Sequence, residues 1–300
     1  MIGPGEDTPD MAAGNLDSEA FGRLTAELRP RLHRYCARML GSAIDGEDVV
    51  QDALIKATEA LSAAGPLERP DSWLFRIAHN TALDALRRRK RMAARFTDSG
   101  FDQVTGPQTA DVRVVAAGSF SAFLNLSPAA RSCVILADVL GYALDEIAEI
   151  LGMTLPAVKA ALHRGRARLK DVAETREPAS APPAAEALAR LRAYADRFNA
   201  RDFDALRDLL AEDVRLDLAN RTRLAGAKDV GIYFTRYAET DGWRFRVGRV
   251  EGRPALLAGG ENDDAVRYVV LLDWSDGKIA AIQDFIYAPY VMDGLAVAEL

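Results

Sequence analysis

The chain has 300 residues, of which 49% are hydrophobic and 27% are charged, and its formal net charge is −6. This length allows two or three domains of roughly 100–150 residues, and the composition is ordinary for a globular protein. Collagen, a continuous coiled coil and wholesale disorder are therefore excluded. The longest uncharged stretch, 114–130, contains Gly118, Asn125 and Pro128, so we expect no membrane-spanning segment.

The start of the chain and the cysteines predict a cytoplasmic protein. Residues 1–14 carry acids, glycine and proline and lack the basic and then apolar start of a signal peptide. Cys36 and Cys133 lie among apolar neighbours without CxxC spacing. We expect buried free thiols rather than a disulfide or a zinc site, and no cofactor.

The first part of the chain, 17–95, predicts three helices. Apolar residues recur every three or four positions from Phe21 to Met39, and Gly41 ends that pattern. Asp45 is a candidate N-cap for a second, acidic helix. A loop at 62–71 precedes a third helix, for which Asp71-Ser72 is the expected cap and which ends in a run of five basic residues, 87–91. Residues 96–118 are expected to form a linker.

A second helical unit is expected over 119–172, and its most specific signal is a helix-turn-helix pattern at 144–163. Ala148 allows two helices to cross closely, Gly152 allows the turn, and Thr154 can cap the second helix. The second helix would present Pro156, Ala157, Lys159, Ala160 and His163 to a major groove, with Arg164, Arg166 and Arg168 near phosphates. An ordinary pair of antiparallel helices is the alternative.

Charge is segregated along the chain. Basic residues gather at 87–91 and 159–170, whereas Asp45, Glu47, Asp48 and Asp52 form an acidic pole. Such segregation suits a protein that meets DNA on one face and a basic protein surface on another. Solvated helix faces are the alternative interpretation.

After a second linker at 173–183, the pattern at 184–300 changes to an α+β domain. Helices are expected at 184–199 and 202–211, followed by strands that form a curved antiparallel sheet. The last two strands are joined by Ser275-Asp276-Gly277-Lys278, which is a strong hairpin signal.

The segments 45–52, 71–88 and 126–128, together with the helix-turn-helix, resemble an extracytoplasmic-function (ECF) sigma factor of the sigma-70 family. The resemblance covers about 17–172 and implies two all-α helical domains, named region 2 and region 4. It implies that the acidic helix binds the β′ coiled coil of core RNA polymerase, and that the third helix and its preceding loop bind the −10 promoter element. The residues so implicated are Asp45, Glu47, Asp48, Gln51 and Asp52 for polymerase, and Asn80, Asp84, Arg87 and Arg88 for −10 DNA. Trp73 and Phe75 are expected to belong to the core rather than to stack on bases. Region 4 would bind the −35 element.

Residues 184–300 resemble SnoaL-like cone-shaped α+β domains, which some of these sigma factors carry. The resemblance implies a regulatory domain in contact with the sigma portion, and leaves open an unknown small ligand. Candidate cone residues are Asp217, Asp284, Tyr233, Tyr237 and Trp243, with a plain aromatic core as the alternative. Some stand-alone relatives are enzymes, but no histidine follows His163, and we expect no enzyme here.

The sequence thus predicts a bacterial sigma factor that brings core polymerase to promoter DNA and that its own C-terminal domain tunes. The alternative is a ligand-responsive helix-turn-helix regulator that does not require polymerase.

Overall fold

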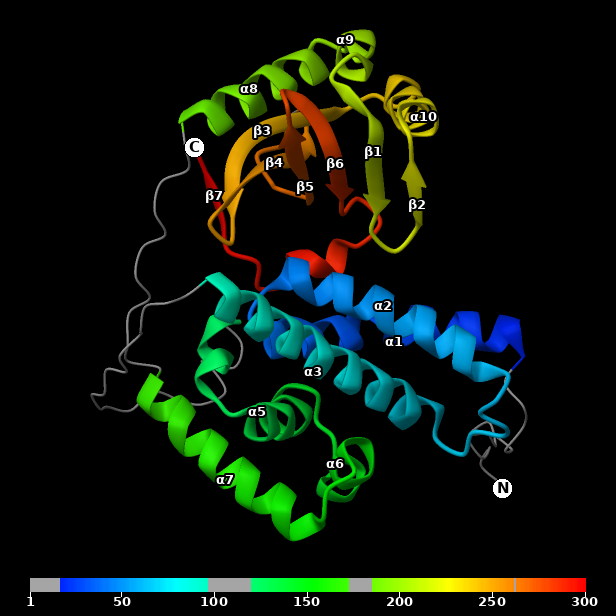
Figure 1. Cartoon of the computed structure of the whole chain (residues 1–300), viewed down its shortest axis with the longest axis vertical. Coiled ribbons are helices and arrows are strands. Elements are labelled where there is room, and N and C mark those ends of the chain that lie inside the picture. Colours follow the sequence, from blue (N-terminus) through cyan, green and yellow to red (C-terminus); the bar gives the residue numbers. More distant parts are fainter. Residues whose placement is uncertain (1–16, 97–119, 173–184, 262) are drawn as a thin grey trace, which may run out of the picture.

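The computed structural model describes residues 17–96, 120–172, 185–261 and 263–300. They form three bodies: an N-terminal helical block (17–96), a central helical block (120–172) and a C-terminal domain (185–300). Figure 1 shows the N-terminal helical block between the other two. Among the described residues, no helix is long and apolar enough to cross a membrane.

The N-terminal helical block consists of three packed helices, α1 (Ser18–Leu40), α2 (Ala43–Leu61) and α3 (Pro70–Phe96). Gly41 ends α1 with a left-handed backbone, φ 76°, as the sequence predicts. The predicted cap of α2 was wrong: the Ser42 side chain accepts from the Asp45 N–H, so the N-cap is Ser42 and Asp45 lies in the first turn. The third helix likewise begins earlier than Asp71, at Pro70, a residue favoured in a first helical turn.

The central helical block contains the predicted helix-turn-helix. Its elements are η1 (Ser121–Asn125), α5 (Pro128–Val134), η2 (Ile135–Val139), α6 (Leu144–Leu151) and α7 (Leu155–Val172). Gly152 has a φ of 63° in the turn between α6 and α7, and the Thr154 hydroxyl accepts from the Ala157 N–H at 3.4 Å. Val158 and Leu162 are buried, so the remaining face of α7 is presented outward.

The C-terminal domain has a seven-stranded sheet with the order β2-β1-β6-β5-β4-β3-β7. Its elements are α8 (Ala185–Asn199), α9 (Phe203–Arg207), β1 (Leu210–Leu218), β2 (Thr222–Ala225), α10 (Ala227–Ala238), β3 (Trp243–Val250), β4 (Arg253–Gly260), β5 (Tyr268–Ser275), β6 (Lys278–Asp284), η3 (Pro289–Met292) and β7 (Val297–Glu299). The predicted hairpin joins β5 to β6, with Ser275 paired to Lys278.

Three features of this domain differ from the sequence prediction. The helix expected at 202–211 ends at Arg207, and Leu210 already begins β1. The sheet is mixed, because β1 pairs with β6 in parallel. A third helix, α10, packs against β1 and β2; its apolar residues, which include Val230 and Phe234, are buried at helical spacing. The domain is therefore the expected α+β fold with one more helix and one parallel pair of strands.

Buried apolar side chains form two clusters. One fills both helical blocks, and it contains the two cysteines, which are free and buried as predicted. The other fills the C-terminal domain, and it also includes Ala37, Ala43, Ile44 and Phe120 from the helical blocks. The contact between the C-terminal domain and the helices therefore has an apolar core as well as polar partners.

Candidate functional site

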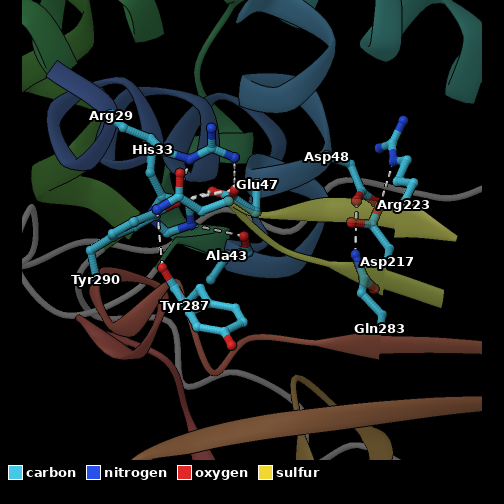
Figure 2. A network of polar contacts seen from close by, with 11 residues as sticks. Arg29, His33, Ala43, Glu47, Asp48, Asp217, Arg223, Gln283, Tyr287 and Tyr290 are labelled. Atoms are coloured by element: carbon cyan, nitrogen blue, oxygen red, sulfur yellow. Dashed lines mark hydrogen bonds and ion pairs between the residues drawn. The ribbon is translucent and has the colours of Figure 1, made fainter. Parts of the chain in front are cut away.

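The acidic end of α2 lies beneath the C-terminal domain, and its most deeply buried group is the Glu47 carboxylate, which is 1% exposed (Figure 2). The Arg29 guanidinium from α1 forms an ion pair with Glu47 Oε1. Tyr290, from η3, donates to Glu47 Oε2 at 3.0 Å and accepts from Arg29 Nε at 2.6 Å. Burial raises the pKa of Glu47, and the charge of Arg29 opposes that rise. A buried ion pair of α1 and α2 thus takes its third partner from the C-terminal domain.

His33 lines the same contact. Its Nε2 lies 2.9 Å from the carbonyl oxygen of Ala43, and its ring centroid lies 5.3 Å from that of Tyr290. Burial lowers the pKa of His33 to about 4. The imidazole is therefore neutral at pH 7, and Nε2–H is the donor to the carbonyl oxygen.

The first turn of α2 is held by the turn between β3 and β4. Glu251 Oε1 accepts from the Ala43 N–H at 2.6 Å, and Oε2 accepts from the Ser42 hydroxyl at 2.6 Å. A carboxylate in this place complements the positive end of the helix dipole. Arg253, which follows in the same hairpin, forms an ion pair with Asp45 at 3.0 Å.

The second turn of α2 faces β1, β2 and β6. Gln283 Nε2 donates to Asp48 Oδ1 at 2.8 Å, while Arg223 pairs with Asp217 at 2.7 Å. Asp217 Oδ1 is buried without a hydrogen-bond partner. The pKa of Asp48 is raised to about 7, mainly by burial and to a lesser extent by the negative charge of Asp217. Asp48 and Asp217 thus form a pair of carboxyl groups across the domain contact (Figure 2).

The predicted polymerase-binding residues are therefore divided in two. Asp45, Glu47 and Asp48 touch the C-terminal domain, whereas Gln51 and Asp52 lie half-buried further along α2. Asp52 faces Arg88 of α3, with 3.9 Å between Oδ2 and Nη2. Sequence reasoning missed the partners on the other side, Glu251, Gln283 and Tyr290, because nothing in their local pattern marks an interface.

The predicted −10 residues lie on α3, some of them beside the central helical block. Asn80, Asp84, Arg87 and Arg88 are all exposed, and Asp84 pairs with Arg87 at 3.0 Å. Both aromatic residues belong to the core, as predicted. Phe75 is fully buried, and Trp73 packs edge-on against Phe21 with 6.5 Å between ring centroids.

The predicted −35 residues lie together on the outer face of α7. Pro156, Lys159, Ala160, His163, Arg164 and Arg166 are exposed, whereas Ala157 and Arg168 are half-buried. Arg166 differs from its neighbours because its guanidinium donates twice to Asp138, at 3.0 and 2.6 Å. Its charge is thus already paired within the central helical block.

A contact between the two helical blocks was also missed. The Nη2 and Nη1 atoms of Arg69, just before α3, pair with Glu146 and Glu149 of α6 at 2.6 and 2.8 Å. Arg76 Nη2 donates to the Glu149 carbonyl oxygen at 3.1 Å. The signal in the sequence was a pair of acids three residues apart on the first helix of a DNA-binding motif.

The interior of the C-terminal domain is filled by aromatic rings around one carboxyl group. Asp284 is fully buried; its Oδ2 accepts from Tyr233 at 2.7 Å and from Tyr237 at 2.9 Å. Burial raises the pKa of Asp284 to about 6. Of the other candidate cone residues, Trp243 packs edge-on against Tyr268. Asp217 was placed wrongly, because it faces α2 at the domain contact rather than the interior.

The comparisons with known proteins follow the three bodies of the structure. Residues 24–92 match sigma-70 region 2, residues 121–169 match sigma-70 region 4, and residues 191–282 match a SnoaL-like domain. Among the described residues, no group of three or more His, Cys, Asp or Glu side chains is placed to hold a metal ion.

Curated relatives are ECF sigma factors. SigG of Mycobacterium tuberculosis is 30% identical over 220 residues, with 64% of this chain and 60% of the relative covered. SigM of Mycobacterium tuberculosis is 30% identical over 153 residues, with 51% of this chain and 76% of the relative covered. The chain thus spans three fifths of the length of SigG.

Among solved structures, the ECF sigma factor SigJ of Mycobacterium tuberculosis is 21% identical, with 88% of this chain and 95% of that chain covered and a TM-score of 0.35. With region 2, region 4 and a SnoaL-like domain in this order, and with a relative of which it covers 76% at 30% identity, the chain belongs to the ECF sigma factors of the sigma-70 family, with a SnoaL-like domain after region 4.

Proposed function

We propose that the protein is a sigma factor that directs core RNA polymerase to specific promoters, and that its SnoaL-like domain tunes this activity by covering the polymerase-binding helix. The observation that carries the proposal is the position of Glu47. The acidic helix assigned to polymerase is the helix on which the C-terminal domain sits, and Tyr290 completes the buried pair of Arg29 and Glu47. We assign region 2 to 17–95, region 4 to 119–172 and the regulatory domain to 184–300; the matched spans support this division.

The chemistry of the contact supports competition between the C-terminal domain and polymerase. The domain offers α2 a cation (Arg253), an amide donor (Gln283) and a phenol donor (Tyr290). A basic coiled coil would satisfy the same carboxylates with charge-assisted hydrogen bonds. Asp45, Glu47 and Asp48 cannot serve both partners at once, so polymerase binding requires the domain to leave.

Because the C-terminal domain is tethered to the helical blocks, even a weak contact with α2 is enough to keep it bound there. A domain tethered by about a dozen residues (173–183) experiences an effective concentration near the millimolar range. The domain therefore occupies α2 even when its own affinity is modest, and core polymerase or a signal can still displace it. We expect truncation after Ala173 to raise promoter output, because the domain that covers α2 is then missing. The two helical blocks should stay folded, since they keep an apolar cluster of their own.

The regulatory domain acts here as a binding module and not as an enzyme. Asp284, its most buried carboxyl group, is already held by two tyrosine hydroxyls and by the Ile286 N–H at 2.8 Å. We place the protein in the cytoplasm, where core polymerase and promoter DNA are found.

Run-off transcription with purified core polymerase tests the proposal. Full-length protein, the truncated chain and the triple variant Asp45→Lys, Asp48→Lys, Asp52→Lys are compared, each also in a pull-down of core polymerase. We expect the truncated chain to bind core more tightly than full-length protein, and the triple variant to lose binding in both backgrounds because attraction becomes repulsion. Core binding by the triple variant at wild-type strength would refute the polymerase assignment, and equal output from full-length and truncated chains would refute the regulatory one.

A further inference from the structure

The contact between the two helical blocks contains an arginine held by two carboxylates. The guanidinium of Arg69 places one nitrogen on Glu146 and another on Glu149, at 2.6 and 2.8 Å. These groups are only partly covered: the side chains are 36%, 30% and 41% exposed, respectively. A planar guanidinium fork that meets two anionic oxygens in this way is also matched to a phosphate group.

The arginine begins a stripe along α3. Arg76, Asn80, Leu83, Arg87 and Lys90 follow at spacings of four, three, four and three, which places them on one face of the helix. The central helical block lies along this face. A hollow of about 370 Å³ is lined by Leu83, Arg87 and Lys90 from α3 and by residues of the central block that include Ser132, Leu151 and Met153. The stripe is cationic at both ends and is partly covered by α5 and α6.

The acids of α6 are unexpected for a DNA-binding motif. The first helix of a helix-turn-helix crosses the DNA backbone, where carboxylates repel phosphates. Glu146 is nevertheless fixed at both oxygens, since Oε2 accepts from the Ala143 N–H at 2.7 Å and Oε1 accepts from Arg69. Glu146 therefore also caps the start of α6. Glu149 has no such role among the described residues, and its position is explained by the arginine that it meets on the other block.

The resemblance already assigns the loop before α3 and α3 itself to −10 DNA. We propose that Glu146 and Glu149 occupy the Arg69–Arg76 part of this surface as internal competitors of the DNA phosphates while the two blocks are closed. Region 4 would then mask the DNA surface of region 2, separately from the masking of α2 by the C-terminal domain. The inference rests on the proposed function only in that promoter binding requires the site to be free.

Fluorescence anisotropy of the full-length protein, without polymerase, tests the proposal with two probes of mixed sequence: a labelled 20-nucleotide single strand and a duplex of the same length. The variants are Glu149→Gln and its matched control Asp145→Asn. The control removes one charge from the same helix, and Asp145 has no ion pair among the described residues. Glu149→Gln should bind about two- to fivefold tighter than the control, as expected for the loss of a competing exposed ion pair.

Arg69→Gln and the double variant Arg69→Gln, Glu149→Gln complete the cycle. The double variant should lose the gain in affinity that Glu149→Gln shows. A plot of the logarithm of its affinity for the single strand against the logarithm of the salt concentration should be less steep than that of Glu149→Gln by about 0.7, as expected for one lost phosphate contact. A gain confined to one probe identifies whether the strand is single or paired, and either result supports a phosphate site. Equal affinities of Glu149→Gln and Asp145→Asn for both probes, or a gain that survives Arg69→Gln, would overturn it. The anisotropy measurements do not involve polymerase, so they test the phosphate site alone. Run-off transcription with the same variants tests the proposed function, so the failure of one proposal can be told from the failure of the other.

Discussion

The Glu251 carboxylate caps a helix that belongs to a different domain. Its Oε1 accepts from the Ala43 N–H, the first residue of α2, at 2.6 Å. Glu251 sits in a tight turn with φ 49°, and Gly252 follows with φ 80°. Because both central residues of the turn have positive φ, the side chain is aimed by the geometry of the β3–β4 hairpin. The start of α2, the helix that we propose for polymerase binding, is therefore stabilised by the C-terminal domain.

Glu251→Ala should loosen the closed form. The variant loses the acceptor for Ala43 and Ser42, a loss comparable to that of a helix cap, which costs about 1 kcal/mol. We expect core polymerase to bind about fivefold tighter and the amides at the start of α2 to exchange faster with deuterium. Glu261→Ala, an exposed acid elsewhere in the same domain, is the control. Unchanged core affinity in Glu251→Ala would show that this cap does not hold the domain in place.

Closure should depend on pH through Asp48. Its pKa is raised to about 7 in the closed form from an ordinary value of 3.8, so closing takes up a proton between these values. The groups that face it are Asp217, Arg223 and Gln283 on the sheet, and Asp45 and Glu47 on its own helix. The protonated carboxyl can donate to the unpartnered Asp217 Oδ1, whereas the carboxylate repels it. Through Asp48 the closed form therefore loses stability as pH rises to about 7. The lowered pKa of the buried His33 acts in the opposite direction below about pH 6.5.

Energy transfer between dyes on α3 and α10 measures this dependence from pH 5 to 8. Asp48→Asn keeps the acceptor for Gln283 and gives Asp217 a donor at every pH. The variant should stay closed at pH 8 and show a flatter profile than the wild type. The raised pKa values of Glu47 and Glu251 act in the same direction, so some slope should remain. An Asp48→Asn profile identical to that of the wild type would exclude Asp48 as the titrating group.

The residues of α7 should separate sequence preference from affinity. Replacing Lys159 or His163 should change the preferred base at one or two −35 positions, each mismatch being worth about 1–3 kcal/mol. Replacing Arg164 or Arg168 should weaken all sequences alike and reduce the salt dependence of binding. Arg166→Ala should have a smaller effect than either, because its charge is paired with Asp138. Binding of the reconstituted holoenzyme to a set of −35 variants checks this, and equal losses on all sequences for every substitution would contradict it.

Gly46 should be sensitive to substitution for a steric reason. A Cβ at Gly46 would lie 2.6 Å from both the Cα and the N of Ala37, so α1 and α2 would have to move apart. We expect Gly46→Ala to lower the free energy of unfolding by about 1–3 kcal/mol. Gly22→Ala is the control, because nothing lies within 4 Å of a Cβ there; it should stabilise α1 slightly. Urea unfolding followed by circular dichroism compares the two variants, and equal stabilities would disprove the steric argument.

The sequence predicts most of the local structure, because local rules determine it. The period of apolar residues, Gly41, the turn at Gly152 and the Ser275–Lys278 hairpin all lie where these rules place them. The cap of α2 was missed by three residues, since Ser42 and Asp45 are both good caps and only packing chooses between them. The parallel pairing of β1 with β6 depends on strands about 60 residues apart, and no local pattern encodes it.

The candidate site was predicted on one side only. The acids of α2 are recognisable from their spacing, whereas Tyr290 and Glu251 meet them from more than 200 positions away. The alternation of residues along β1 is predicted correctly, so Asp217 lies on the opposite face from Leu216. Which of the two faces points into the domain depends on the packing of α2 against the sheet, and the sequence of β1 does not determine it. The placement of Arg69 against Glu146 depends on how two separate helical blocks dock, which composition does not determine.

Phe120, the first described residue of the central helical block, lies where all three bodies meet. Its ring is 5.2 Å from the guanidinium carbon of Arg38, and its Cζ would be 3.2 Å from a Cβ on Gly294. The side chain is 8% exposed, and burying a Phe is worth about 1.5–3 kcal/mol. Departure of either neighbour would expose this ring, so the first departure lowers the cost of the second. The chain should therefore populate fully closed and fully open forms with few intermediates, so that the surfaces of α2 and α3 become accessible together in each molecule.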